Sequence, residues 1–86
     1  MKIKETDFKA KQRLDCCGHL CPVPILMTEE KMEDLRAGDI LEVLYTDIGA
    51  KADLGAWCRA TGHALLFIRE NGRVSFAYIR KADIPK

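Results

Sequence analysis

The segment Cys21-Pro22-Val23-Pro24 does most to constrain the fold, because its two prolines fix where a helix can begin. Pro22 suits the first helical position, since its φ is already helical and an N–H there would have no intrahelical partner. Pro24 removes a second donor near the same end. We therefore expect a helix to begin at Pro22, with a stiffened loop around Cys21. Val23 and Ile25 would supply the nearest free N–H groups.

The same placement favours a thiolate on Cys21. The aligned peptide dipoles leave roughly half a positive charge at a helix N-terminus, which stabilises a nearby anion by about 0.3 to 2 kcal/mol. Because about 1.4 kcal/mol corresponds to one pKa unit, we expect the pKa of this thiol to lie below that of a free cysteine. Cys21 is therefore the candidate nucleophile of the chain.

Length and charge indicate one small domain with a basic arm. The chain has 86 residues, 48% of them hydrophobic, which is near the size where burial only just outweighs conformational entropy. Residues 1–13 carry five Lys or Arg against two acids, a net charge of +3, whereas the whole chain carries +1 and the remainder therefore −2. We interpret residues 1–13 as a mobile basic arm, with a partner-docking strip as the alternative, and residues 14–86 as a single domain.

Charge and cysteine usage also exclude several classes of protein. A net charge of +1 argues against direct binding to nucleic acid or to an anionic membrane. Residues 1–13 hold no apolar run as long as a signal sequence or a membrane span, so we expect a cytoplasmic protein. Three of the four cysteines crowd into residues 16–21, which suits a reducing compartment better than a disulfide scaffold.

Local signals along the chain predict the element order βαβαββ. Gly38 is expected to end the first helix, Asp47 to cap the second and Gly62 to close it. Asn71-Gly72 between two apolar runs is a strong hairpin signal. The expected elements are a short strand from Leu14 to Cys16, a helix from Pro22, a strand over 40–46, a helix over 50–61, and strands over 64–69 and 74–81.

These elements predict an α+β fold, a two-layer α/β sandwich with a four-stranded mixed sheet. Both strand-helix-strand crossovers should be right-handed, and if the strands are added in one direction the two helices then lie on one face of the sheet. The other face would then be bare, and residues such as Leu44 and Ile68 would be partly exposed there and available to a partner. The order of the strands does not follow from the sequence.

The chain resembles the TusA/SirA-like family of small sulfur-carrier proteins over nearly all of residues 14–81. The family has a Leu-Asp-x-x-Gly-Leu-x-Cys-Pro-x-Pro element before its first helix, and Leu14 to Pro24 matches it except that His19 stands in place of Leu. Ile48 replaces a Pro that usually follows Asp47. The other matching pieces are Gly38-Asp39, Asp47 to Leu54, Trp57-Cys58, Gly62-His63 and Ile79-Arg80-Lys81.

This resemblance implies a sulfurtransferase-type carrier whose motif cysteine, Cys21 here, holds sulfane sulfur as a persulfide and passes it to a partner's thiol. It implies two partners, a persulfide donor such as a cysteine desulfurase-like or rhodanese-like protein, and a downstream sulfur acceptor. No cofactor need be bound. The residues expected to shape the loop around Cys21 are Asp15, Gly18, Pro22 and Pro24.

Two further residues are candidates for an auxiliary role. Cys17, at i−4 from Cys21, is spaced to resolve a persulfide by forming a disulfide, and a passive side chain is the alternative. His19 could hydrogen-bond or protonate a leaving sulfur, or be an exposed loop side chain. Zinc on Cys16, Cys17, His19 and Cys21 would have poor tetrahedral geometry, so we expect no metal.

Two other functions remain open from the residues alone. The chain could be a non-catalytic regulatory or protein-interaction module that uses the bare sheet face, with its cysteines incidental. It could also be a soluble companion of a transporter for a sulfur compound, with the same chemistry and a different acceptor. Cys58 and His63 are expected to be structural.

Overall fold

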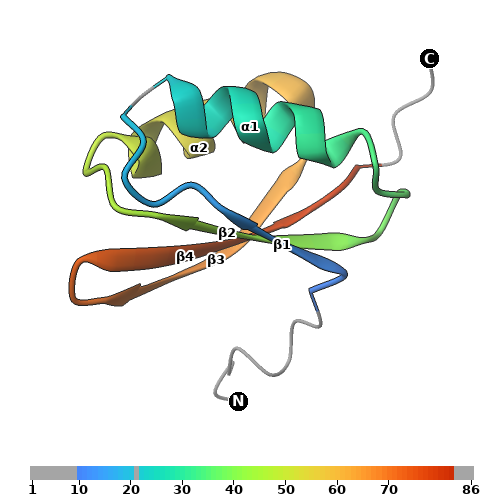
Figure 1. Cartoon of the computed structure of the whole chain (residues 1–86). Coiled ribbons are helices and arrows are strands. Elements are labelled where there is room, and N and C mark those ends of the chain that lie inside the picture. The colour runs from blue at the N-terminus through green and yellow to red at the C-terminus, as the bar shows by residue number, and fades with distance from the viewer. Residues whose placement is uncertain (1–9, 21, 83–86) are drawn as a thin grey trace.

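The computed structural model describes residues 10–20 and 22–82, which form four strands and two helices (Figure 1). The elements are β1 (Gln12–Asp15), α1 (Val23–Met32), β2 (Ile40–Tyr45), α2 (Ala50–Thr61), β3 (Ala64–Asn71) and β4 (Val74–Arg80). The predicted order βαβαββ is confirmed. Most of the predicted basic arm, residues 1–9, lies outside the described residues, as does Cys21.

The strands form one mixed sheet in the order β1-β2-β4-β3. β1 pairs with β2 in parallel, and β4 pairs with both β2 and β3 in antiparallel. α1 and α2 both lie over the same face of this sheet (Figure 1), so the predicted two-layer sandwich is confirmed. No helix within the described ranges is long and apolar enough to cross a bilayer.

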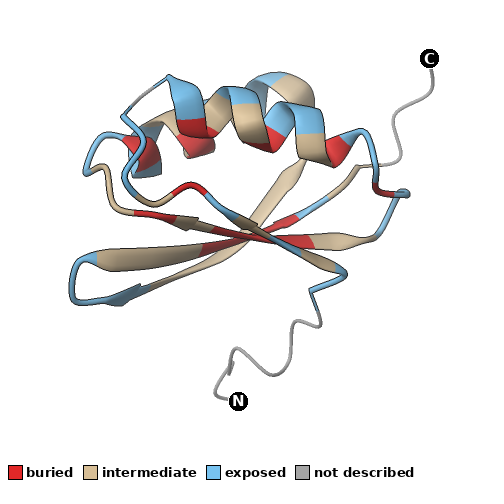
Figure 2. Ribbon diagram, in the orientation of Figure 1, coloured by how far each residue is buried: buried red, intermediate tan, exposed pale blue. Residues whose placement is uncertain are grey.

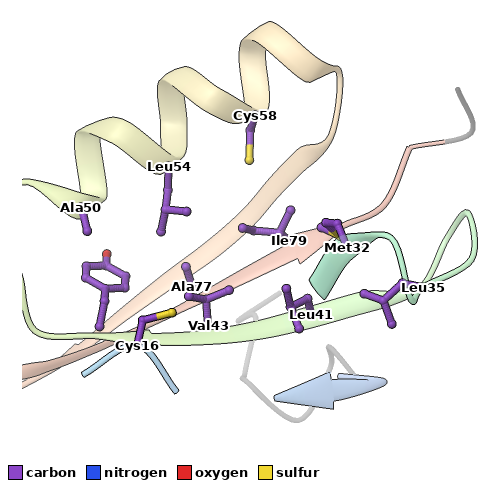
Figure 3. Packing of buried hydrophobic residues seen from close by; sticks show 11 residues of the cluster. Cys16, Met32, Leu35, Leu41, Val43, Ala50, Leu54, Cys58, Ala77 and Ile79 are labelled. Atoms are coloured by element: carbon purple, nitrogen blue, oxygen red, sulfur yellow. The ribbon is translucent and has the colours of Figure 1, made fainter. Parts of the chain in front are cut away.

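The core lies between the helices and the sheet, as the colouring by burial in Figure 2 shows. Alternation along β2 places Leu41, Val43 and Tyr45 under the helices, each with at most 2% of its surface exposed. Cys58 directs its sulfur from α2 toward the sheet (Figure 3). The other buried apolar residues of this cluster are Cys16, Met32, Leu35, Ala50, Leu54, Ala77 and Ile79.

Two helix boundaries differ from the prediction. α1 ends at Met32, and i to i−3 hydrogen bonds, including one from the Leu35 N–H to the Met32 carbonyl, turn the chain until Leu35 is buried. Gly38, with φ +90°, therefore serves the turn before β2 and does not cap the helix. α2 has Gly49 at its N-cap, because helical backbone already begins one residue before Ala50. The predicted capping by Asp47 is wrong.

The hairpin between β3 and β4 forms one residue later than the sequence suggested. Asn71 pairs with Val74, so the two turn residues are Gly72 and Arg73. Gly72 has φ +65° and Arg73 has a negative φ, which is the pattern of a type II′ turn. Asn71 extends the strand because glycine alone supplies the positive φ that this turn requires.

The face of the sheet away from the helices, called the open face below, carries polar and aromatic side chains that contact one another. Glu42 accepts hydrogen bonds from Arg13 on β1 and from Tyr78 on β4, which ties three strands together. Arg69 stacks over the Phe76 ring at 4.0 Å. Burial alone would raise the pKa of Glu42, but these hydrogen bonds outweigh it and lower the pKa. Leu44 pairs with Phe76 and is half-buried on this face, as expected.

Ile68 lies on the opposite side from the one predicted. A bulge between Leu65 and Phe67 inserts one residue, and this reverses the alternation along β3. Ile68 therefore pairs with the buried Ala77 and packs against the core under α2, while Phe67 faces Tyr78 on the open face.

The burial pattern predicts that two truncations six residues apart in the sequence change the stability of the protein by very different amounts. Leu54→Ala should lower the free energy of unfolding by about 2 to 5 kcal/mol, because Leu54 is fully buried and leaves a cavity. Ile48→Ala, at a residue 97% exposed, should change it by less than about 0.5 kcal/mol. Urea unfolding followed by circular dichroism measures both. Equal destabilisation by the two variants would contradict the core described above.

His63 anchors the chain after β4. Its Nδ1 accepts a hydrogen bond of 3.0 Å from the Ala82 N–H, and its ring lies 5.1 Å from that of Trp57. Burial, with Lys81 nearby, lowers the pKa of His63 from its ordinary value of 6.5. The folded protein therefore holds this imidazole in its neutral form.

A lowered histidine pKa predicts a loss of stability on mild acidification. Between about pH 7.5 and 5.5 the unfolded chain takes up the His63 proton first, so the free energy of unfolding should fall as the pH falls. His63→Asn keeps a hydrogen-bond acceptor and cannot titrate, so its stability should fall less over this range. Urea titrations of both proteins at each pH test this. Parallel pH profiles would show that His63 does not couple folding to protonation.

Candidate functional site

The candidate site lies at one end of the sheet, where two loops meet. β1 and β2 are parallel, so the β1–α1 loop and the β2–α2 loop both leave the sheet at its same edge (Figure 1). The first of these loops carries the predicted motif. Cys21 itself lies outside the described residues, whereas Leu20 and Pro22 on either side of it are described and exposed.

Asp15 shapes the start of this loop. Its Oδ1 accepts a hydrogen bond of 2.9 Å from the Cys17 N–H, which makes an Asx turn directly after β1. This hydrogen bond lowers the pKa of the Asp15 carboxyl, which is therefore ionised at neutral pH. The carboxylate thus turns the chain as it leaves the sheet.

Gly18 connects the two loops. It has φ +84°, a conformation that side chains with a Cβ rarely adopt. Its N–H donates a hydrogen bond of 2.9 Å to Thr46 Oγ1 at the end of β2. Thr46 was not among the predicted site residues, and its only signal in the sequence is a hydroxyl side chain at the end of a predicted strand. This hydrogen bond fixes the β1–α1 loop against the β2–α2 loop.

The start of α1 differs in detail from the prediction. Pro22 occupies the N-cap, so Val23 and Pro24 are the first two helical residues. The Val23 N–H donates to the Leu20 carbonyl at 2.9 Å, and the Ile25 N–H donates to the Pro22 carbonyl at 3.1 Å. The prediction that these two N–H groups are free is therefore wrong. The dipole of the helix still favours an anion at this end.

Pro24 fixes the helix to the sheet. It is fully buried, and its carbonyl accepts a hydrogen bond of 2.7 Å from Thr28 Oγ1. The same carbonyl lies 4.0 Å from the sulfur of Cys16, which follows β1 and contributes its own N–H to the Leu44 carbonyl. These contacts connect Cys16, before the motif cysteine, to β2 and to α1, and Pro24, after it, to the helix core.

The three described cysteines are free thiols with raised pKa values. Burial raises the pKa of Cys16 and of Cys58 to about 11. Partial burial, and then the hydrogen bond and charge of Asp15, also raise the pKa of Cys17. These environments disfavour a thiolate at all three positions, so none of the three is a good nucleophile at neutral pH.

The remaining candidates are a histidine and a metal site. The His19 side chain is exposed. The backbone N–H of His19 donates a hydrogen bond of 3.2 Å to the Cys16 carbonyl, which helps to close the turn. Within residues 10–20 and 22–82, no group of three or more His, Cys, Asp or Glu side chains is placed to hold a metal ion. A single cysteine at a helix start can act as a nucleophile and as a leaving group without further groups.

Comparison with known proteins places this chain in a family. The model of the family described as Sulfurtransferase TusA matches residues 12–81. The sulfur carrier protein TusA of Pseudomonas putida (strain F1) is 36% identical over 76 residues, which cover 88% of this chain and 95% of that protein. YrkI of Bacillus subtilis (strain 168) is 44% identical over 74 residues, covering 86% of this chain and 99% of YrkI.

Some relatives are longer than this chain. YrkF of Bacillus subtilis is also 44% identical over 74 residues, but the match covers only 40% of its length. Among solved structures, a SirA-like protein from Desulfitobacterium hafniense superposes with a TM-score of 0.72, covering 84% of this chain and 99% of that chain. Since the two sequences are 19% identical, this likeness supports the fold alone.

Two glycine substitutions should change stability in opposite directions. Gly18→Ala should lower the free energy of unfolding by about 1 to 2 kcal/mol, because the strain of a positive φ applies although no atom lies within 4 Å of the added Cβ. Gly55→Ala, inside α2 with 3.5 Å to the flexible Arg59 side chain, should raise it by about 0.5 to 1 kcal/mol. Thermal unfolding measures both, and a neutral Gly18→Ala would contradict the loop conformation.

Proposed function

We propose, because this chain belongs to the sulfurtransferase TusA family, that Cys21 accepts sulfane sulfur as a persulfide and transfers it to a thiol of a partner protein. The protein would thus be a sulfur carrier in a relay between proteins. Relatives with the name sulfur carrier protein TusA support this role at the level of the family.

The observation that carries the proposal is the contrast between Cys21 and the other three cysteines. Cys16, Cys17 and Cys58 lie in environments that raise their pKa values. Cys21 directly precedes the N-cap of α1, where the helix dipole favours an anion. Of the four cysteines, Cys21 is therefore the one that we expect to form a thiolate, and it stands at the motif position of the family.

The proposed transfer needs no oxidant or reductant. The Cys21 thiolate attacks the outer sulfur of a donor persulfide, the donor's S–S bond breaks, and the donor leaves as a thiolate. The new S–S bond lies on Cys21, and the transferred sulfur keeps its proton. An acceptor thiolate then attacks that outer sulfur and releases Cys21 as a thiolate. A leaving group that is stable as an anion makes this second step faster.

The loop residues would act by positioning. Asp15 and Gly18 direct the chain away from β1 and against Thr46, while Pro22 and Pro24 set the helix behind the sulfur. We assign no direct contact with the transferred sulfur to any of them. Their rigidity lowers the entropic cost of bringing the Cys21 sulfur to a partner's sulfur.

Cys17 and His19 are the proposed auxiliary residues. The carboxylate of Asp15 opposes a thiolate on Cys17, so Cys17 would become reactive only after a partner changes that environment. His19 is exposed and so is free to approach a bound partner's sulfur. The donor would be a cysteine desulfurase-like or rhodanese-like protein in the cytoplasm, and the acceptor a second protein of the relay.

Substitution of single cysteines tests the proposal. After incubation with cysteine and a cysteine desulfurase, or with thiosulfate and a rhodanese, the wild-type protein should gain the mass of one sulfur atom on Cys21. Cys21→Ser should gain none, because serine cannot form a persulfide, and Cys17→Ser should gain it as the wild type does. Peptide mass spectrometry under non-reducing conditions locates the sulfur.

The controls separate folding from chemistry. Cys21→Ser should unfold at the same temperature as the wild type, because position 21 falls between β1 and α1 in the sequence and the substitution changes one atom of its side chain. If the Cys21→Ser protein gained as much sulfur as the wild type, another cysteine would be the sulfur acceptor. An unmodified wild-type protein with both donors would contradict the proposed activity.

A further inference from the structure

The large apolar side chains that are exposed in the described part of the chain gather around the candidate site. They are Leu20 (72% exposed), Val23 (38%), Leu26 (59%) and Ile48 (97%), and we call them the apolar collar. Single exposed apolar residues are normal on any protein surface. Here all of them lie in, or within one helical turn of, the two loops at the Cys21 end of the sheet.

The topology explains why these residues share one end of the molecule. Leu20, Val23 and Leu26 belong to the β1–α1 loop and the first turn of α1, and Ile48 belongs to the β2–α2 loop. The parallel pairing of β1 and β2 puts both loops at one edge, and the hydrogen bond from Gly18 to Thr46 holds them together. In the chain, Cys21 lies between Leu20 and Val23.

Charge is depleted in the same segment. Residues 16–28 contain no Asp, Glu, Lys or Arg, although these types make up 31% of the chain. Charged residues resume at once on either side, with Asp15 before the segment and Glu29 and Glu30 after it. Depletion of charged residues is typical of the core of a protein–protein interface.

A hollow continues the collar along α1. Leu26 borders it together with Leu14 and Met27, and it has a volume of about 340 Å³. Glu30, Lys31 and Asp34 also line it. A hollow lined by three apolar and three charged residues can accept an apolar side chain of a partner.

We propose that the apolar collar is the docking surface for the proteins that exchange sulfur with this chain, with Ile48 as its anchor on the second loop. This inference rests on the proposed function. The occupant is a partner protein that presents its own sulfur-bearing cysteine from an apolar surface, because direct transfer requires the two sulfur atoms to come into contact. Donor and acceptor must therefore use the collar in turn.

A second copy of this chain fits the collar less well than a different protein. A symmetric pair would place the same patch of both copies against each other. Both Cys21 positions would then be enclosed, and neither donor nor acceptor could reach them. The collar is thus suited to a transient partner that brings a thiol or a persulfide with it.

Comparing a protein donor with a small donor tests this inference. Ile48→Gln and Leu26→Gln replace apolar surface by a polar side chain at exposed positions, and Ala60→Gln, exposed near the far end of α2, is the matched control. The donors are a persulfidated cysteine desulfurase, a persulfidated rhodanese and inorganic tetrasulfide. The rate of sulfur loading on Cys21 is measured by mass spectrometry at carrier concentrations where loading is second order.

The expected result is selective. Ile48→Gln and Leu26→Gln should load at least about tenfold more slowly from a protein donor, as expected for the loss of an apolar anchor, and at the wild-type rate from tetrasulfide. Ala60→Gln should match the wild type with every donor. Wild-type rates for both collar variants with the protein donors would overturn the inference and leave the proposed function intact.

Other outcomes are equally decisive. Slower loading from tetrasulfide as well would show that the collar affects thiol reactivity and not docking, which overturns the inference. A wild-type dimer in sedimentation that Ile48→Gln dissociates would identify a second copy as the occupant and overturn it too. Absence of sulfur on the wild-type protein with all three donors would overturn the proposed function itself, and the inference with it.

Discussion

The parallel pairing of β1 with β2 is the constraint on which the rest of the structure depends. A parallel pair must be joined by a crossover, which here is α1, and the carboxyl ends of both strands then face the same edge. The loop after β1 carries the motif, and the loop after β2 supplies Thr46, whose hydroxyl accepts the Gly18 N–H. If the pairing were antiparallel, these two loops would lie at opposite ends of the sheet.

The electrostatics of the site come from contrasts between neighbouring cysteines. Cys16 is buried under α1, and the Asp15 carboxylate accompanies Cys17, so thiolates are disfavoured at both positions. The first N–H groups of α1 are either absent, at Pro24, or engaged in turns, at Val23 and Ile25. These N–H groups are therefore not free donors for an anion, whereas the dipole of α1 still favours negative charge at this end of the helix.

Much of this fold follows from local signals, and the differences have specific physical causes. Pro22 and Gly62 lie at helix ends because the restricted φ of proline and the positive φ open to glycine suit these places, and strand alternation correctly placed Leu44 on the open face. Ile68 was assigned to the wrong face because a bulge in β3 changes the alternation without a sequence signal. Asp47 does not cap α2 because the backbone reaches helical geometry at Gly49.

The site was less predictable than the fold. The motif indicated Cys21 and its loop, but the contact between Gly18 and Thr46 joins residues 28 positions apart and depends on strand pairing. Strand order, and with it the neighbour of each loop, is a property of the whole sheet. The gathering of Leu20, Leu26 and Ile48 at one end likewise requires the topology, since only two of the three are close in sequence.

The pH dependence of alkylation at each cysteine tests the central claim most directly. Brief treatment with iodoacetamide across a range of pH, followed by peptide mass spectrometry, gives a rate for each of the four thiols. The account predicts that Cys21 reacts fastest at neutral pH and loses its reactivity at a lower pH than Cys17, while Cys16 and Cys58 react only on unfolding. A Cys17 rate equal to or above that of Cys21 at neutral pH would contradict it.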